Sequence, residues 1–268
     1  MPLRPVTLEE LEIDDRAAVK GVAICGRLEA FLRRAGHRFL VPEAEGQLGW
    51  GWDRALFLNL TYWSPEAGAD VLCERRLPAD VVAHVAWHEL CARELARGAA
   101  GAPPSAAALF LAESIASAFD LYLCGRLLTL APDSDFITTQ VPLLAERAQG
   151  AGLSEAGFTA LLEDVGRAPE RAFEDLRALL FDAANALVAC ATPLEAAAAL
   201  ERLGGRRFAP LLHHYELSNW ILYARAYAAG PAPDRLVTEV DRTLRAAPDA
   251  LDWLDRNWLE AALAAPAG

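Results

Sequence analysis

Two histidines and a glutamate in neighbouring segments have the types and the spacing of metal ligands. His84 and His88 are four residues apart in the segment that follows Pro78. At this spacing both imidazoles lie on one face of a helix, one turn apart, and can bind the same ion. The next predicted helix is apolar except for a narrow polar stripe that begins at Glu113. The sequence therefore predicts a metal site with two imidazoles and one carboxylate.

The polar stripe continues with Ser117 and Asp120, at positions i+4 and i+7 from Glu113, so the three side chains share one helix face. A buried carboxylate is costly unless it is paired or bound to a metal. We expect Glu113 to be the third ligand, with Ser117 and Asp120 orienting the ligands or a bound water. The alternative is a structural one, in which the stripe pairs with a buried arginine such as Arg126 or Arg225.

This arrangement resembles the glutamate-zincin metalloenzymes, which have a strand, then a helix with the motif H-E-x-x-H, then a second helix with a glutamate in an E-x-x-x-D context. The resemblance extends from residue 56 to residue 126, with 56–63 as the strand. It implies His84, His88 and Glu113 as the ligands of one divalent metal.

Two positions depart from that family. Val85 stands where the family has its catalytic glutamate, and Ser117 stands where it has an aspartate, with Asp120 one turn later as a substitute. Because valine cannot accept a proton, ordinary peptidase activity is not expected unless another group supplies the base. Two histidines and one carboxylate also form the ligand set of non-haem Fe(II) oxygenases, whose chemistry does not need that base. A zincin-like binding protein without catalysis fits the sequence equally well.

A second histidine pair lies far along the chain, in a predicted helix over 208–229. His213 and Glu216 are three residues apart and can share a helix face, with His214 beside them. If this helix packs against the first pair of helices, it can supply an acid or base, a fourth ligand or a second metal, as in helical di-iron oxidases. The candidate catalytic residues are the groups that could supply the missing base. They are Glu89, which follows the second histidine of the first pair, and His214 and Glu216 of this segment.

The elements that must position these residues are mainly helical. We expect an α+β fold of one domain, 1–268, in which an N-terminal helix and a small sheet (1–78) precede the metal-site helices (79–130) and a helical remainder (131–268). Thr7-Leu-Glu-Glu opens a predicted helix over 7–35, which Gly36 ends. Aromatic and β-branched residues predict two or three strands between residues 37 and 63. Further helices are predicted over 79–97, 105–129, 154–165, 169–190, 193–203, 208–229, 233–246 and 248–264.

Composition excludes several classes of protein. Apolar residues make up 54% of the 268, which is too many for a disordered chain, and the net charge of −12 disfavours nucleic acid as a partner. We found no uninterrupted apolar run of membrane-spanning length and no signal peptide, so we expect a cytoplasmic protein. The five cysteines fit free thiols in a reducing compartment. The expected function is that of a metal-dependent enzyme that uses Fe(II) or Zn(II) on a small molecule or a peptide.

Overall fold

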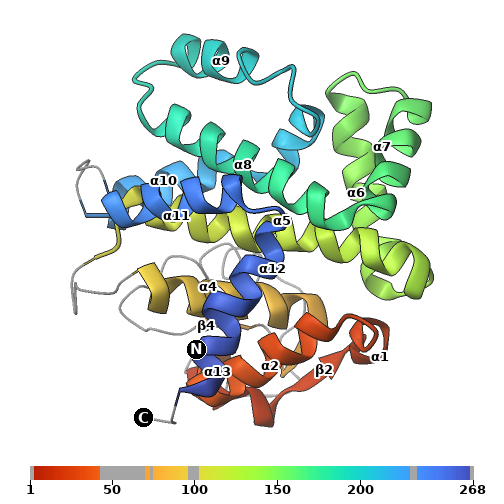
Figure 1. The fold of residues 1–268 in the computed structure, drawn as a ribbon, viewed down its shortest axis with the longest axis vertical. Helices are drawn as coiled ribbons and strands as arrows, with labels where there is room; N and C mark the ends of the chain where they lie inside the picture. The colour runs from red at the N-terminus through yellow and green to blue at the C-terminus, as the bar shows by residue number, and fades with distance from the viewer. Residues whose placement is uncertain (1–2, 43–69, 73–74, 96–102, 230–233, 266–268) are drawn as a thin grey trace.

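The structure is a computed structural model that describes residues 3–42, 70–72, 75–95, 103–229 and 234–265. It is mainly helical with a small β part near the N-terminus, which confirms the predicted fold class (Figure 1). The predicted strand over 56–63 lies outside the described residues.

Short strands and helices alternate in the N-terminal part. They are β1 (Leu3–Thr7), the 3-10 turn η1 (Leu8–Glu10), β2 (Glu12–Asp14), α1 (Arg16–Val19), α2 (Ala23–Ala35), β3 (Arg38–Pro42), β4 (Asp70–Val71) and β5 (Arg76–Pro78). Strand β1 pairs antiparallel with β3, and β3 pairs parallel with β4, which sets Phe39 opposite Asp70. Strand β2 pairs parallel with β5. Two small sheets therefore connect the start of the chain to the segment that ends at Pro78.

The prediction of a continuous helix over 7–35 was wrong for its first half. Glu10 does accept from the backbone N–H of Thr7 over 3.0 Å, but this capping interaction opens only the short η1 turn. Leu11 is extended, and the next residues pair with β5 as β2. Pairing with a distant strand has overridden the local helical pattern. The predicted end was right, because Gly36 closes α2 with a left-handed backbone at φ +66°.

Helices form the rest of the described chain. They are α4 (Ala79–Leu95), α5 (Ala106–Leu130), α6 (Asp135–Gly150), α7 (Glu155–Arg167), α8 (Pro169–Val188), α9 (Pro193–Glu201), the 3-10 helix η3 (Ala209–Tyr215), α10 (Leu217–Tyr227), α11 (Arg235–Ala246), α12 (Ala250–Leu254), the π-helical turn η4 (Asp255–Leu259) and α13 (Glu260–Ala264). Most of them match the predicted segments within a few residues.

No helix was predicted for residues 135–150, where the structure has α6. The predicted break at Ala131-Pro-Asp-Ser-Asp is right, because it separates α5 from α6, and Pro142 lies inside the new helix. The side chain of Ser134 caps this helix by accepting from the N–H of Ile137. Phe136, Ile137 and Leu144 are buried, so packing against the core offsets the cost of a proline in the helix interior.

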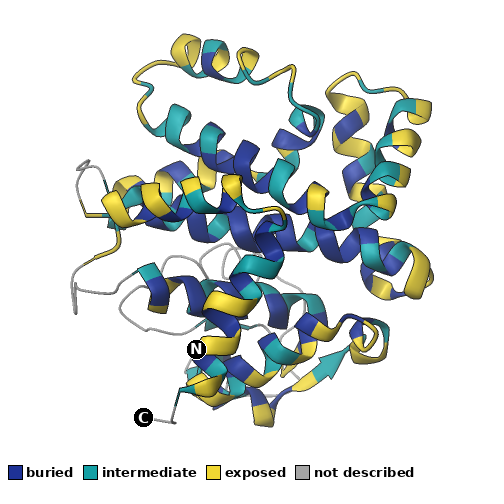
Figure 2. Ribbon diagram, in the orientation of Figure 1, coloured by how far each residue is buried: buried dark blue, intermediate teal, exposed yellow. Residues whose placement is uncertain are grey.

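Helix α5 lies at the centre of the fold, between α4 on one side and α8 on the other (Figure 1). It is long and apolar enough to cross a membrane by length and composition, but 72% of its most apolar 18-residue stretch is buried inside the protein. Figure 2 shows the same helix as mostly buried. Its place in the core therefore explains its apolar sequence.

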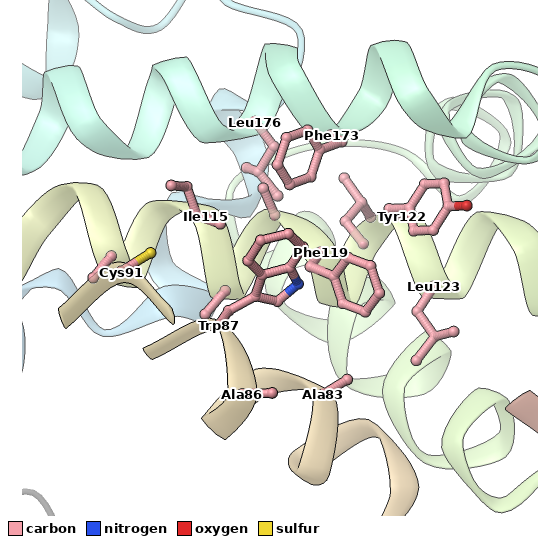
Figure 3. Packing of buried hydrophobic residues seen from close by; sticks show 14 of the residues in the cluster. Ala83, Ala86, Trp87, Cys91, Ile115, Phe119, Tyr122, Leu123, Phe173 and Leu176 are labelled. Carbon is pink, nitrogen blue, oxygen red and sulfur yellow. The ribbon is translucent and has the colours of Figure 1, made fainter. Parts of the chain in front are cut away.

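Aromatic packing fixes α4 against α5. Trp87 of α4 is fully buried, and its ring meets that of Phe119 of α5 edge-on, with 5.7 Å between the centroids. Phe173 and Leu176 of α8 lie above this pair (Figure 3). Because Trp87 directly precedes His88, its burial sets the rotation of α4 about its own axis and therefore the direction in which the two histidines point.

Candidate metal centre

The polar faces of α4 and α5 meet in the order that the sequence spacing predicts. His84 and His88 lie one turn apart on α4, and Asp120 and Glu113 lie two turns apart on α5. His84 contacts Asp120 and His88 contacts Glu113, so the two helices run in opposite directions along this contact. Histidine on one helix faces carboxylate on the other.

His84, His88 and Glu113 each offer one potential ligand atom, and these atoms all lie within 4.8 Å of one another. Nε2 of His88 is 3.7 Å from Oε2 of Glu113, and the two imidazole centroids are 5.0 Å apart. Ligand atoms around a tetrahedral ion with bonds of about 2.0 to 2.2 Å lie about 3 to 4 Å from each other. Because no separation exceeds 4.8 Å, the three atoms are within about 1 Å of that geometry.

Asp120 fixes the ring of His84. Its Oδ2 atom lies 2.9 Å from Nδ1 of His84, and the imidazole is four-fifths buried. Burial alone lowers the pKa of His84, but the charge and the hydrogen bond of Asp120, with smaller contributions from Glu113 and Asp80, raise it to about 9. An Nδ1–H group held by a carboxylate leaves Nε2 as the ring atom that can bind a metal.

His88 is in a different electrostatic state. Its Nε2 atom is buried and has no hydrogen-bond partner among the described residues. Burial lowers the pKa of His88, and the charge of His84 lowers it further, against the opposing effect of Glu113. A buried neutral imidazole with an unsatisfied nitrogen beside a carboxylate is the state that a metal ligand requires. The donor types and positions of the three residues therefore fit a divalent metal, whose binding would release the proton from Nε2 of His84.

Among the described residues, neither Arg126 nor Arg225 pairs with the polar stripe of α5. Arg126 pairs with Glu170 at 3.4 Å, and Arg225 donates to the backbone carbonyls of Val188 and Cys190. Ser117 is buried within the stripe.

The sequence analysis missed Asp80, which lies one turn before His84 on α4. Burial and the charge of Asp120 raise the pKa of this carboxyl to about 6. Asp80, His84 and His88 follow a four-residue spacing, and this regularity was the signal that could have identified it.

Glu89 belongs to a second cluster beside the ligands. Its Oε2 atom lies 3.2 Å from Nδ1 of His37, and the other ring nitrogen of His37 lies 2.9 Å from Oδ2 of Asp70. Glu89 is thus in an ion pair with His37, and it is not among the three grouped ligand residues. His37 and Asp70 were not identified from the sequence, because strand pairing brings them to α4 from distant positions.

The helical spacing assumed for the second histidine segment was wrong. Residues 209–215 form the 3-10 helix η3, Glu216 has a left-handed backbone at φ +46°, and only then does α10 begin. Leu211 and Leu212 are buried, so packing of these two side chains accompanies the tighter turn. His213 and Glu216 therefore do not share a face of one α-helix.

The three polar residues of that segment differ in their surroundings. His213 is exposed, and exposed Glu216 accepts a hydrogen bond from Nδ2 of Asn219 over 2.8 Å. His214 is half-buried, and burial lowers its pKa against an opposing effect from Asp120. The charge of Asp120 on α5 thus acts on His214. The described residues contain one group of three possible ligands, and His213, His214 and Glu216 do not belong to it.

Comparison with known proteins adds no relative. No family model matches the chain, and no curated protein or solved structure is significantly similar to it. The geometry of the residues therefore carries the assignment of the metal site.

Proposed function

We propose that this chain is a cytoplasmic metal-dependent enzyme that binds one divalent ion, Fe(II) or Zn(II), through His84, His88 and Glu113. The observation that carries the proposal is the convergence of the three ligand atoms within 4.8 Å, with the buried Nε2 atom of His88 lacking any other partner among the described residues. Bound there, such an ion would supply Lewis-acid or redox chemistry.

The neighbouring residues support an oxidative reaction better than a hydrolytic one. Val85, which follows the first histidine, cannot take a proton from a water molecule. Glu89 is engaged by His37. Two histidines and one carboxylate are the ligand set of non-haem Fe(II) oxygenases, and an iron ion held by them would supply redox chemistry with O₂. The substrate class is a small molecule or a peptide.

The residues of the chain divide the remaining tasks. Asp120 holds the ring of His84 in one orientation and keeps a proton on Nδ1. His214, half-buried and with a lowered pKa, is the candidate acid or base from the second histidine segment. Glu216 is the weaker candidate, because it is exposed and already accepts a hydrogen bond from Asn219.

A second candidate function is a zincin-like binding protein that retains the metal without catalysis. Val85 at the position of the catalytic glutamate favours this alternative. A di-iron oxidase is the third, and it needs a second ion held in part by His214 or Glu216.

Two matched assays separate these functions. The chain is loaded with Fe(II) without oxygen, or with Zn(II), and then tested for O₂ uptake with a reductant and for cleavage of a mixed peptide pool. If the wild type consumes O₂ faster than Glu113→Gln protein at the same Fe(II) concentration, the oxidative function is supported. Cleavage by the zinc form alone would replace it with a hydrolase, and bound metal without either activity would leave the binding protein.

A further inference from the structure

His37 joins two carboxylates that come from different elements. Its Nε2 atom lies 2.9 Å from Oδ2 of Asp70, and its Nδ1 atom lies 3.2 Å from Oε2 of Glu89. The imidazole side chain is only 13% exposed, whereas each carboxylate is more than a third exposed. Both ring nitrogens are therefore used, and each has a negatively charged partner. Phe39 packs edge-on against the imidazole, with 4.9 Å between the ring centroids, and fixes its plane.

The three residues connect the sheet to the ligand helix. His37 lies directly before β3, Asp70 begins β4, and β3 and β4 are paired. Glu89 belongs to α4 and directly follows the ligand His88. The bridge from His37 to Glu89 is thus a polar contact between this sheet and α4, one residue from the metal ligand.

The bridge suits a positioning task. A neutral imidazole has one N–H group and can donate to one carboxylate. An imidazolium has two N–H groups and can donate to two carboxylates at once. Burial alone lowers the pKa of His37, but its hydrogen bonds to Asp70 and Glu89 outweigh burial and raise the pKa to about 9. The side chain is therefore charged at neutral pH, and charge-assisted hydrogen bonds are stronger and more directional than neutral ones.

We propose that His37 is a positioning residue of the metal site, which holds α4 at the rotation that directs His88 toward Glu113 by bridging Asp70 and Glu89. This inference rests on the proposed metal site. Loss of an outer hydrogen-bonding partner of a metal site typically weakens binding by about 10- to 100-fold. The contact of His37 with α4 is one step further from the metal, so we expect a loss near the lower end of that range.

The test uses Co(II) as the probe, because its visible absorption reports the number and arrangement of its ligands. Affinity and spectrum are measured for the wild type, for His37→Gln and for His37→Arg, with Arg38→Gln as the matched control at an exposed neighbouring position. Glutamine has donors at one end only and cannot span both carboxylates, whereas arginine keeps the charge and several donors.

We expect His37→Gln to bind Co(II) about 10-fold more weakly with an altered spectrum, and His37→Arg to recover both in large part. Arg38→Gln should match the wild type. If the wild type binds Co(II) and His37→Gln has unchanged affinity and spectrum, the positioning role is wrong while the metal site stands, even if the variant is less stable to heat. Tighter binding by His37→Gln, or no recovery in His37→Arg, would also overturn it. A wild type that binds no Co(II) would overturn both proposals.

Discussion

Nδ1 of His84 lies 2.9 Å from Oδ2 of Asp120, across the contact between α4 and α5. This hydrogen bond joins the two helices and occupies Nδ1, so Nε2 is the ring nitrogen of His84 that can bind a metal. A carboxylate behind a ligating histidine is the common means by which proteins orient the ring and raise its basicity. The same contact holds the two ligand-bearing helices in register.

Replacement of Asp120 by asparagine should weaken metal binding by about 10- to 100-fold without changing the number of ions bound at saturation. The amide retains an acceptor but loses the charge that stabilises the His84 side chain. Competition with a metal-binding dye measures the affinity. Asp133→Asn, at an exposed site before α6, is the control and should match the wild type. Equal affinity of the two variants would remove Asp120 from the account.

Loss of a ligand should have a larger effect than loss of Asp120. His84→Ala, His88→Ala and Glu113→Gln should each fail to retain stoichiometric metal after desalting, because two donors alone bind weakly. His213→Ala removes an exposed histidine outside the grouped ligands and should retain one ion per chain. Elemental analysis of the four variants checks this. Retention by all three ligand variants would mean that the metal is held elsewhere.

The ion pairs of His37 should make the stability of the metal-free protein depend on pH. The folded-state pKa, about 9, lies above the ordinary value of 6.5. The stabilisation is therefore fully present below about pH 6.5 and is lost as the pH rises through about 9. The shift corresponds to about 3 kcal/mol, and we expect about 1 to 2 kcal/mol because Asp70 and Glu89 are more than a third exposed.

Urea unfolding of the wild type and His37→Gln at about pH 6 and about pH 10 measures that dependence. The difference in unfolding free energy between the two proteins should be large at the lower pH and small at the higher one. His84 also has a raised pKa, but it is present in both proteins and its contribution cancels. A difference that stays constant with pH would show that His37 contributes through packing alone.

Trp87 should be essential to the packing of α4, although its Nε1 donor has no partner among the described residues. Trp87→Ala leaves a large cavity beside Phe119 and should lower the unfolding free energy by about 3 to 5 kcal/mol. Trp87→Phe fills more of the space and removes an unsatisfied donor, so its cost should be clearly smaller. Urea unfolding measures the unfolding free energy of both variants. An equal decrease in the two would contradict this description of the core.

The sequence could predict those parts of the site that depend on helical spacing alone. His84 and His88 are four residues apart, and Glu113 begins a regular stripe on the next helix, so their grouping follows from local periodicity and one antiparallel contact. The His37 cluster could not be predicted this way, because β3 and β4 must pair before Asp70 and Glu89 meet one imidazole. The helical pattern was also misleading at 7–15, where strand pairing overrode it, and at 209–216, where a 3-10 helix forms.

The most direct test of the account is the metal content of the purified chain. Protein purified without added metal, and a parallel sample loaded with Fe(II) without oxygen and then desalted, are analysed for zinc and iron. We expect about one ion per chain in at least one sample, and no retained ion in the same sample of Glu113→Gln protein. Two irons per chain would point to the di-iron alternative, and no retained metal in either sample would contradict the proposed site.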